Sequence, residues 1–145
     1  MILVQTQLDM LSEISRTLSS GDLSEFHKMI AGRRVTSVLL GSLNETSMSI
    51  IHNGKVLATG GSNECLWFVT SKYVDSLTPR ERLQMLNLLK EHLETCRARM
   101  EPELMSNLVW EGNAQHIRLL EHLGARFADH TVTSPAGFPF RQFWL

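Results

Sequence analysis

The pattern of apolar and polar positions divides the chain into three stretches, and the first stretch is mainly helical. Apolar residues recur there at the spacing of one helix face, at Leu8, Leu11, Ile14 and Leu18. The segment SSGD interrupts this run, and Asp22 then opens a capping-box pattern, DLSE, which predicts a short helix that ends at Gly32. The following segment, RRVTSVLLGSL, is compatible with a further helix or with a strand.

The middle stretch predicts a hairpin followed by a buried strand. Asn53 and Gly54 separate two β-rich runs, and this pair tolerates the positive φ angles of a tight type I′ turn. Gly60 and Gly61 are expected to form a turn where the second run ends. The apolar run ECLWFVTS then predicts a central strand covered on both faces.

The longest predicted helix follows, from about Thr78 to Arg99. Thr78 is a natural N-cap, Pro79 suits the first turn, and Glu81 completes a capping box. The expected buried stripe comprises Leu83, Leu86, Leu89, Leu93 and Cys96.

The last stretch predicts a strand, a helix and two antiparallel strands. The run LMSNLVW is the first strand, Asn113 caps the helix, and Gly124 stands where a left-handed residue ends it. The terminal run FPFRQFWL is apolar on both faces, so we expect it to be either an inserted, covered strand or an oligomer contact. The buried stripe of the helix comprises Ile117, Leu120 and Leu123.

This order of elements indicates the fold class. Two strand–helix–strand crossovers in a mostly antiparallel sheet predict an α+β protein with helices on both faces. The strands that contain Trp67 and Val109 are expected in one mixed sheet. A length of 145 residues fits a single domain over residues 1–145, and no internal repeat or linker divides it.

Composition and charge exclude several classes of function. The formal net charge of −1 gives no basic footprint for nucleic acid. No apolar run approaches the roughly 20 residues of a membrane helix, and the opening MILVQTQLDML lacks the basic start of a signal peptide. Cys65 and Cys96 form no disulfide framework, which suits a reducing compartment. The spacing of the six histidines predicts no metal site.

The predicted order, ending in LVWEGNAQHIRLLEHLGARF, resembles the carboxyl half of the GNAT acetyltransferase superfamily over about residues 46–145. Asn113 matches the asparagine that opens the late helix of that family, and Gly124 with Phe127 resembles its glycine–hydrophobic stop. Leu120 stands where the family commonly carries a tyrosine that acts as general acid. Within this fold, the runs CLWFVTS, NAQHIRLLEHLG and FRQFWL are most similar to the internal virion protein A family of short-tailed phages.

The resemblance implies a coenzyme A site at the start of the long helix, where backbone amides of a glycine-rich turn bind the pyrophosphate. The corresponding segment, SKYVDSLTPRER, contains no glycine, and Pro79 removes one amide donor. We therefore expect no cofactor. If the site survives, acetyl-coenzyme A is the expected ligand, and the candidate binding residues are Lys72, Thr78, Arg80, Arg82 and Asn113.

Catalytic chemistry has only weak candidates in this sequence. Transfer of an acetyl group to an amine needs a base and a proton donor, and Leu120 cannot donate a proton. Glu111 and His116 flank a strand-to-helix corner and are the candidates for a base. The simpler interpretation is that the negative charge of Glu111, just before a helix start, interacts favourably with the helix dipole and that His116, in the first turn, is exposed.

The sequence thus predicts a phage internal virion protein with a structural, assembly or ejection role on a degenerate GNAT fold, without transferase activity. The expected partners are other virion proteins or further copies of the chain, with no nucleic acid and no membrane segment. The expected location is the host cytoplasm during assembly and then the virion. Two alternatives remain: an acyl-coenzyme-A-dependent N-acetyltransferase and a module that binds host proteins.

Overall fold

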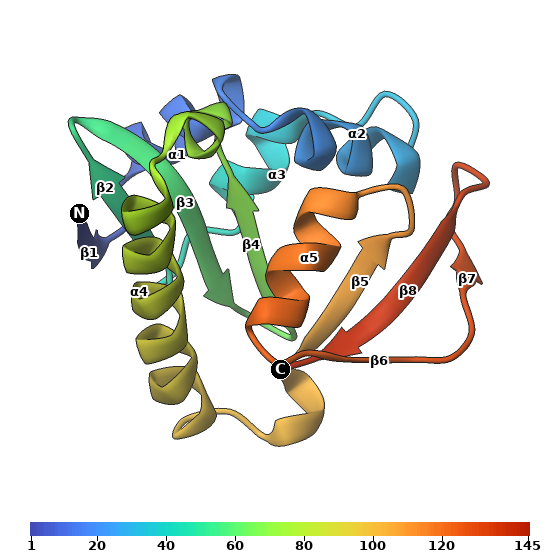
Figure 1. Cartoon of the computed structure of the whole chain (residues 1–145). Coiled ribbons are helices and arrows are strands. Elements are labelled where there is room, and N and C mark those ends of the chain that lie inside the picture. Colours follow the sequence, from blue (N-terminus) through green and yellow to red (C-terminus); the bar gives the residue numbers. More distant parts are fainter.

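The computed structural model describes residues 1–145, and Figure 1 shows its helices around two sheets. The strands are β1 (Ile2–Gln5), β2 (Met48–His52), β3 (Lys55–Ser62), β4 (Leu66–Thr70), β5 (Ser106–Trp110), β6 (Arg126–Phe127), β7 (Val132–Thr133) and β8 (Pro139–Trp144). The helices are α1 (Leu8–Arg16), α2 (Ser20–Met29), α3 (Val35–Gly41), α4 (Pro79–Arg97) and α5 (Ala114–His122), with short 3-10 turns η1 (Lys72–Ser76) and η2 (Pro102–Leu104). The α+β class with mostly antiparallel strands is confirmed.

The strands form two four-stranded sheets, so the expectation of one continuous mixed sheet is wrong. The first sheet has the order β1-β2-β3-β4, and in the second β8 pairs with β5, β6 and β7. β4 and β5 start close together, where the Asn107 side chain donates to the Leu66 carbonyl at 2.6 Å, and diverge toward their ends (Figure 1). This divergence leaves a wedge between the two sheets.

The hairpin of the first sheet is confirmed. β2 pairs with β3, and Asn53 (φ 50°) and Gly54 (φ 71°) form the left-handed turn between them. Gly60 and Gly61 lie within β3 instead of forming a turn after it, because their backbones pair with β4. β1 was not predicted from the sequence. It lies at the edge of the sheet, where it pairs with β2.

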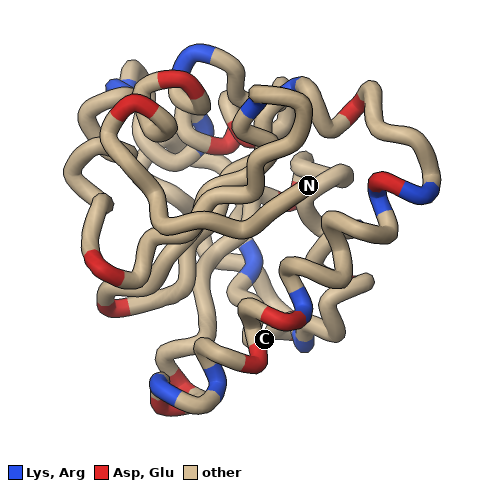
Figure 2. The backbone as a smooth tube through the Cα atoms, turned by 90° about the vertical axis from the view of Figure 1, so that its left-hand side faces the viewer, with Lys and Arg blue, Asp and Glu red and all other residues tan.

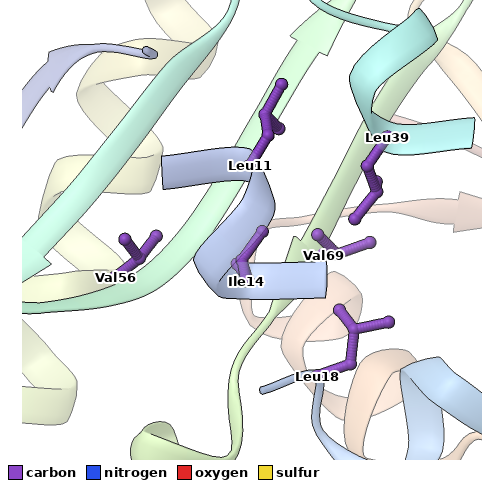
Figure 3. Close-up of a cluster of buried hydrophobic side chains, with 6 residues drawn as sticks. All are labelled: Leu11, Ile14, Leu18, Leu39, Val56 and Val69. Carbon is purple, nitrogen blue, oxygen red and sulfur yellow. The ribbon is translucent and has the colours of Figure 1, made fainter. Parts of the chain in front are cut away.

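Helices cover both faces of the first sheet. Figure 3 shows the cluster on one face, in which α1 and α3 pack on β3 and β4; its buried members are Leu11, Ile14, Leu18, Leu39, Val56 and Val69. Adjacent residues of a strand point to opposite faces, so Leu57 joins a second cluster with Met85 of α4. The segment around residue 38, which the sequence left open between helix and strand, is helical. Its helix α3 buries Leu39 in the first cluster.

The second sheet explains the doubly apolar terminal run. β8 lies between β5 on one side and β6 and β7 on the other, so it is an inserted strand. Phe143 packs with Val109 and Leu120 under α5. Phe140 is also buried, with an exposure of 1%.

The predicted helix ends are largely confirmed. Thr78 and Glu81 form the capping box of α4, Asn113 accepts from the His116 amide at the start of α5, and Gly124 after α5 has a φ of 86°. The start of α2 was predicted wrongly: Ser19 is its N-cap and accepts from the amide of Asp22, which is itself inside the first turn.

The predicted stripe of α4 is wrong at one position. Leu83 is 58% exposed, and Met85 is buried in its place. Leu93 is buried as predicted, and Leu86, Leu89 and Cys96 are partly buried. α4 ends at Arg97, two residues before the predicted end.

Charged residues of both signs are distributed along the chain. Figure 2 shows Lys and Arg positions interspersed with Asp and Glu positions along the backbone. None of the helices has the length and apolar character required to cross a membrane.

Candidate functional site

Two acidic residues of α2 bridge the diverging ends of β4 and β5. Asp22 accepts hydrogen bonds from the amide and the hydroxyl of Thr70, at the end of β4, at 2.8 and 2.9 Å. Glu25 accepts from the amide of Trp110, at the end of β5, at 3.0 Å. Because these carboxylates are one helical turn apart, α2 holds the ends of the two sheets at a fixed separation.

Asn113 joins this bridge to α5. Its side-chain amide donates to Asp22 at 3.0 Å and to Glu25 at 3.2 Å, while its oxygen caps the His116 amide at 3.3 Å. Asn113 is only 2% exposed, so all of its side-chain atoms serve protein contacts. The candidate ligand residue is thus a structural connector in this geometry.

His116 lies inside the wedge, and the expectation of an exposed first-turn histidine is wrong. It is 9% exposed, and its ring meets Phe68 edge-on with centroids 4.7 Å apart. Nδ1 is 3.5 Å from Asp22 and 3.8 Å from Glu25, within ion-pair range, yet neither ring nitrogen makes a hydrogen bond. The imidazole therefore faces two carboxylates without the close, directed contact of a catalytic pair.

Burial raises the pKa of Glu25, and this effect outweighs the opposing influences of His116 and the Trp110 amide. Asp22, at 5% exposure, adds a second buried carboxylate beside it. The bridge thus places two carboxyl groups where ionisation is costly, because they are removed from water. Hydrogen-bond donors from three different parts of the chain offset this cost. We refer to Asp22, Glu25, Asn113 and His116 as the bridge cluster.

The start of α4 is closed by its own side chains. The Thr78 amide donates to Glu81 at 2.7 Å, and the Glu81 amide donates to the Thr78 hydroxyl at 3.2 Å. The Thr78 amide and His52 lower the pKa of Glu81, which keeps its carboxylate charged at this helix end. An anionic side chain thus occupies the position where the GNAT resemblance places a pyrophosphate, and the residues present do not fit that group.

The basic candidates near this helix end do not converge. Lys72 and Arg80 are exposed, and no acidic side chain pairs with either. The Arg82 guanidinium donates to the backbone carbonyls of Leu77 and Asp75 at 3.2 and 3.1 Å. Arg82 therefore stabilises the turn before α4, and no amide cradle stands beside these three side chains.

The remaining catalytic candidate is paired elsewhere. Glu111 accepts from Arg141 of β8 at 2.7 Å, in an ion pair that ties the end of β5 to the central strand of its sheet. Leu120, where the resemblance puts a proton donor, is fully buried in the core. The structure therefore brings His116 and Asn113 together but leaves Glu111 outside the bridge cluster.

A cleft of about 640 Å³ lies between α4 and α5, in front of β4. His116 forms part of its deep end, and it also lines a second cleft of about 410 Å³ on the opposite side of the wedge. The residues that line the cleft between α4 and α5 are Ser19, Asp22, Phe68, Thr70, Val74, Asp75, Arg82, Leu83, Met85, Leu86, Gln115, His116, Arg118, Leu119 and His122.

The sequence did not identify Asp22 and Glu25 as site residues. Asp22 was interpreted as a helix cap, and Glu25 as its capping-box partner. One signal was available: two acids three residues apart lie on the same face of a helix. However, their partners Thr70 and Trp110 are 48 and 85 residues further along the chain, and no local pattern connects them.

Solved structures of similar fold are acetyltransferases. The ribosomal-protein-alanine N-acetyltransferase of Brucella melitensis aligns with a TM-score of 0.64 and 12% identity, over 99% of this chain and 98% of that chain. The aminoglycoside acetyltransferase AAC(6')-Ib in complex with coenzyme A aligns with a TM-score of 0.61 and 14% identity, over 97% and 92%. The GNAT acetyltransferase of Bacillus anthracis aligns at 0.58 and 8% identity, over 98% and 91%. The protein therefore has the GNAT fold.

The sequence comparisons place the chain in a phage family. It belongs to the family described as "Bacteriophage T7, probable scaffold protein Gp13", whose profile matches residues 46–132, more than half of the chain. The "Probable scaffold protein gp13" of Escherichia phage T7 is 36% identical over 76 residues, which cover 51% of this chain and 53% of that protein. The match thus spans about half the length of this curated relative. The predicted relation to phage proteins is confirmed, whereas the narrower assignment to internal virion protein A stays a prediction.

Proposed function

We propose that this protein is a structural or assembly component of a phage particle, built on a GNAT fold and without acetyltransferase activity. The observation that carries the proposal is its membership of the family described as a probable scaffold protein. A scaffold-type protein acts by contacting other particle proteins, so its fold has to present stable surfaces and needs no reactive centre. We expect it in the host cell during assembly and in the particle or its precursors.

The geometry supports the absence of transferase chemistry. The start of α4 carries the Glu81 carboxylate in a capping box, which opposes an anionic coenzyme there. Leu120 has no proton to donate, and Glu111 is held by Arg141. Likeness of fold at 8–14% identity does not by itself carry the acetyltransferase activity of the similar structures.

A genetic and biochemical experiment tests this function. We expect a phage that lacks the gene to lose titre, and mass spectrometry of gradient-purified particles and precursors to detect the protein in at least one of them. Complementation with Lys72→Ala or Arg80→Ala should restore the titre fully, because both residues are exposed and their only proposed role is to bind coenzyme phosphates. Absence of the protein from all particle forms would overturn the proposal.

A further inference from the structure

Resting on the proposed function, we propose that the cleft between α4 and α5 binds a short apolar segment of another particle protein that carries at least one carboxylate. The cleft measures about 640 Å³, within the range of roughly 300–1,000 Å³ typical of binding pockets. Its apolar lining includes Phe68, Met85 and Leu119. This lining is suited to the apolar side chains of such a segment.

Leu83 is the clearest sign of an unfilled apolar contact in this cleft. It is 58% exposed, although α4 is amphipathic and its other face is packed on the sheet. When a partner covers an exposed leucine at the edge of a concave apolar surface, the burial of apolar area stabilises the complex. Leu83 lies one turn after the start of α4, so its side chain would not contact a coenzyme bound at the helix start.

The rim of the cleft is positively charged. Arg118 and His122 of α5 make no ion pair and no hydrogen bond, and Arg82 is bonded to carbonyls only, so its charge is not neutralised. The one acid on the rim, Asp75, accepts a hydrogen bond from Gln115 at 2.9 Å. This imbalance favours a carboxylate of the bound segment near Arg118.

The deep end of the cleft favours an uncharged group. His116 is 9% exposed, both of its ring nitrogens are buried, and Nδ1 lies 3.5 Å from the Asp22 carboxylate. Asp22 beside it opposes a second carboxylate at this depth. Together these features specify a peptide with apolar side chains on the walls and an acidic side chain at the rim.

Selection from a random octapeptide library displayed on a carrier tests the specificity directly. Peptides are selected on the wild-type protein and counter-selected on the double variant Leu83→Ser, Arg118→Gln. We expect the recovered peptides to combine apolar residues with Asp or Glu. Their affinity, measured by fluorescence anisotropy, should fall about fivefold for Arg118→Gln, as for loss of one ion pair of about 1 kcal/mol.

Matched controls come from exposed residues outside the cleft. Arg126→Gln removes a charge and Leu104→Ser removes an exposed leucine (45% exposed), and both should leave peptide affinity unchanged. Thermal unfolding of each variant verifies that the fold persists. The proposal is overturned if no selected peptide distinguishes the wild type from the double variant, or if the selected peptides lack acidic residues.

The same variants separate this inference from the proposed function. If the wild-type protein enters particles and the double variant enters them equally well, the cleft does not dock a partner but the assembly role stands. If the wild-type protein enters no particle form, the assembly role itself fails. We expect wild type, Arg126→Gln and Leu104→Ser in particles, and the double variant to be depleted at least about fivefold, in line with the loss of affinity.

Discussion

The Glu25 carboxylate of α2 accepts a hydrogen bond from the backbone amide of Trp110 at 3.0 Å, although 85 residues separate them. Three residues earlier, Asp22 makes the corresponding contact with Thr70. β4 and β5 share no backbone ladder, and the hydrogen bond from Asn107 to Leu66 joins them where they start, away from the open end of the wedge. The width of the wedge, and with it the shape of the cleft, therefore depends on two acidic side chains of one helix.

Replacing Asp22 tests this bridge. Asp22→Ala removes the acceptor of a buried backbone amide and of the Asn113 side chain, so we expect the free energy of unfolding to fall by about 2–3 kcal/mol. Urea denaturation followed by tryptophan fluorescence measures the change. Glu121→Ala, an exposed acid of α5, is the control and should stay within about 0.5 kcal/mol of wild type. Equal effects of the two substitutions would show that Asp22 does not hold the sheets.

The raised pKa of Glu25 predicts a specific pH dependence. A carboxyl whose folded-state pKa is raised contributes stability below its unfolded pKa of about 4.3, and this contribution is lost as the pH rises through the folded-state pKa. Gln cannot ionise and retains an oxygen for the Trp110 amide. The stability of Glu25→Gln relative to wild type should therefore increase as the pH rises above about 4.3.

Urea denaturation at a series of pH values from about 4 to 8 measures this difference, across the ordinary range of carboxyl and histidine pKa values. Asp22 and His116 face Glu25 in both proteins. Glu121→Gln is the matched control, because it makes the same replacement at an exposed acid outside the bridge cluster, and its difference from wild type should change less with pH than that of Glu25→Gln. A difference for Glu25→Gln that shrinks with rising pH would contradict a pKa of Glu25 raised by burial.

Local patterns predicted most of the fold. The Asn53–Gly54 hairpin, the Thr78–Glu81 capping box and the Asn113 cap depend on neighbours within a few residues, and each is where the sequence indicated. The start of α2 was misplaced because Ser19 competes with Asp22 as N-cap, and a long-range bond from Asp22 to Thr70 decides between them.

The candidate site was less predictable because it is formed by distant segments. Asn113 could be found from its motif, whereas Glu25 and the burial of His116 depend on how α2 packs over the gap between the sheets. The split between β4 and β5 has no local signal, since each strand has an ordinary apolar pattern. Leu83 was expected to be buried because periodicity places it on the apolar face of the helix. Periodicity does not show how far the neighbouring elements extend to cover that face, and Leu83 is exposed.

Close contact between strands predicts different outcomes for two glycines. A Cβ at Gly60 would lie 2.6 Å from both the Phe68 Cβ and the Trp67 carbonyl oxygen, so Gly60→Ala should lower the free energy of unfolding by at least about 2 kcal/mol. Gly41, at the end of α3, has no atom within 4 Å of such a Cβ, and Gly41→Ala should be neutral or stabilise by up to about 1 kcal/mol. Denaturant unfolding of both variants measures this contrast. Similar losses would contradict the close approach of β3 and β4.

The central claim is that this GNAT fold does not bind acetyl-coenzyme A, and isothermal titration calorimetry tests it most directly. Each backbone amide bond to a charged group contributes about 1.5–3 kcal/mol, and each 1.4 kcal/mol changes the dissociation constant about tenfold. At about 2.2 kcal/mol each, the middle of this range, loss of two such bonds at the start of α4 weakens binding more than about a thousandfold and moves a micromolar site to millimolar.

An aminoglycoside acetyltransferase of the same fold, titrated in parallel, establishes that the coenzyme and the conditions support binding. For this protein we predict no saturable heat and no thermal shift with acetyl-coenzyme A at about 1 mM. A saturable titration with a micromolar dissociation constant, weakened by Lys72→Ala or Arg80→Ala, would contradict the account.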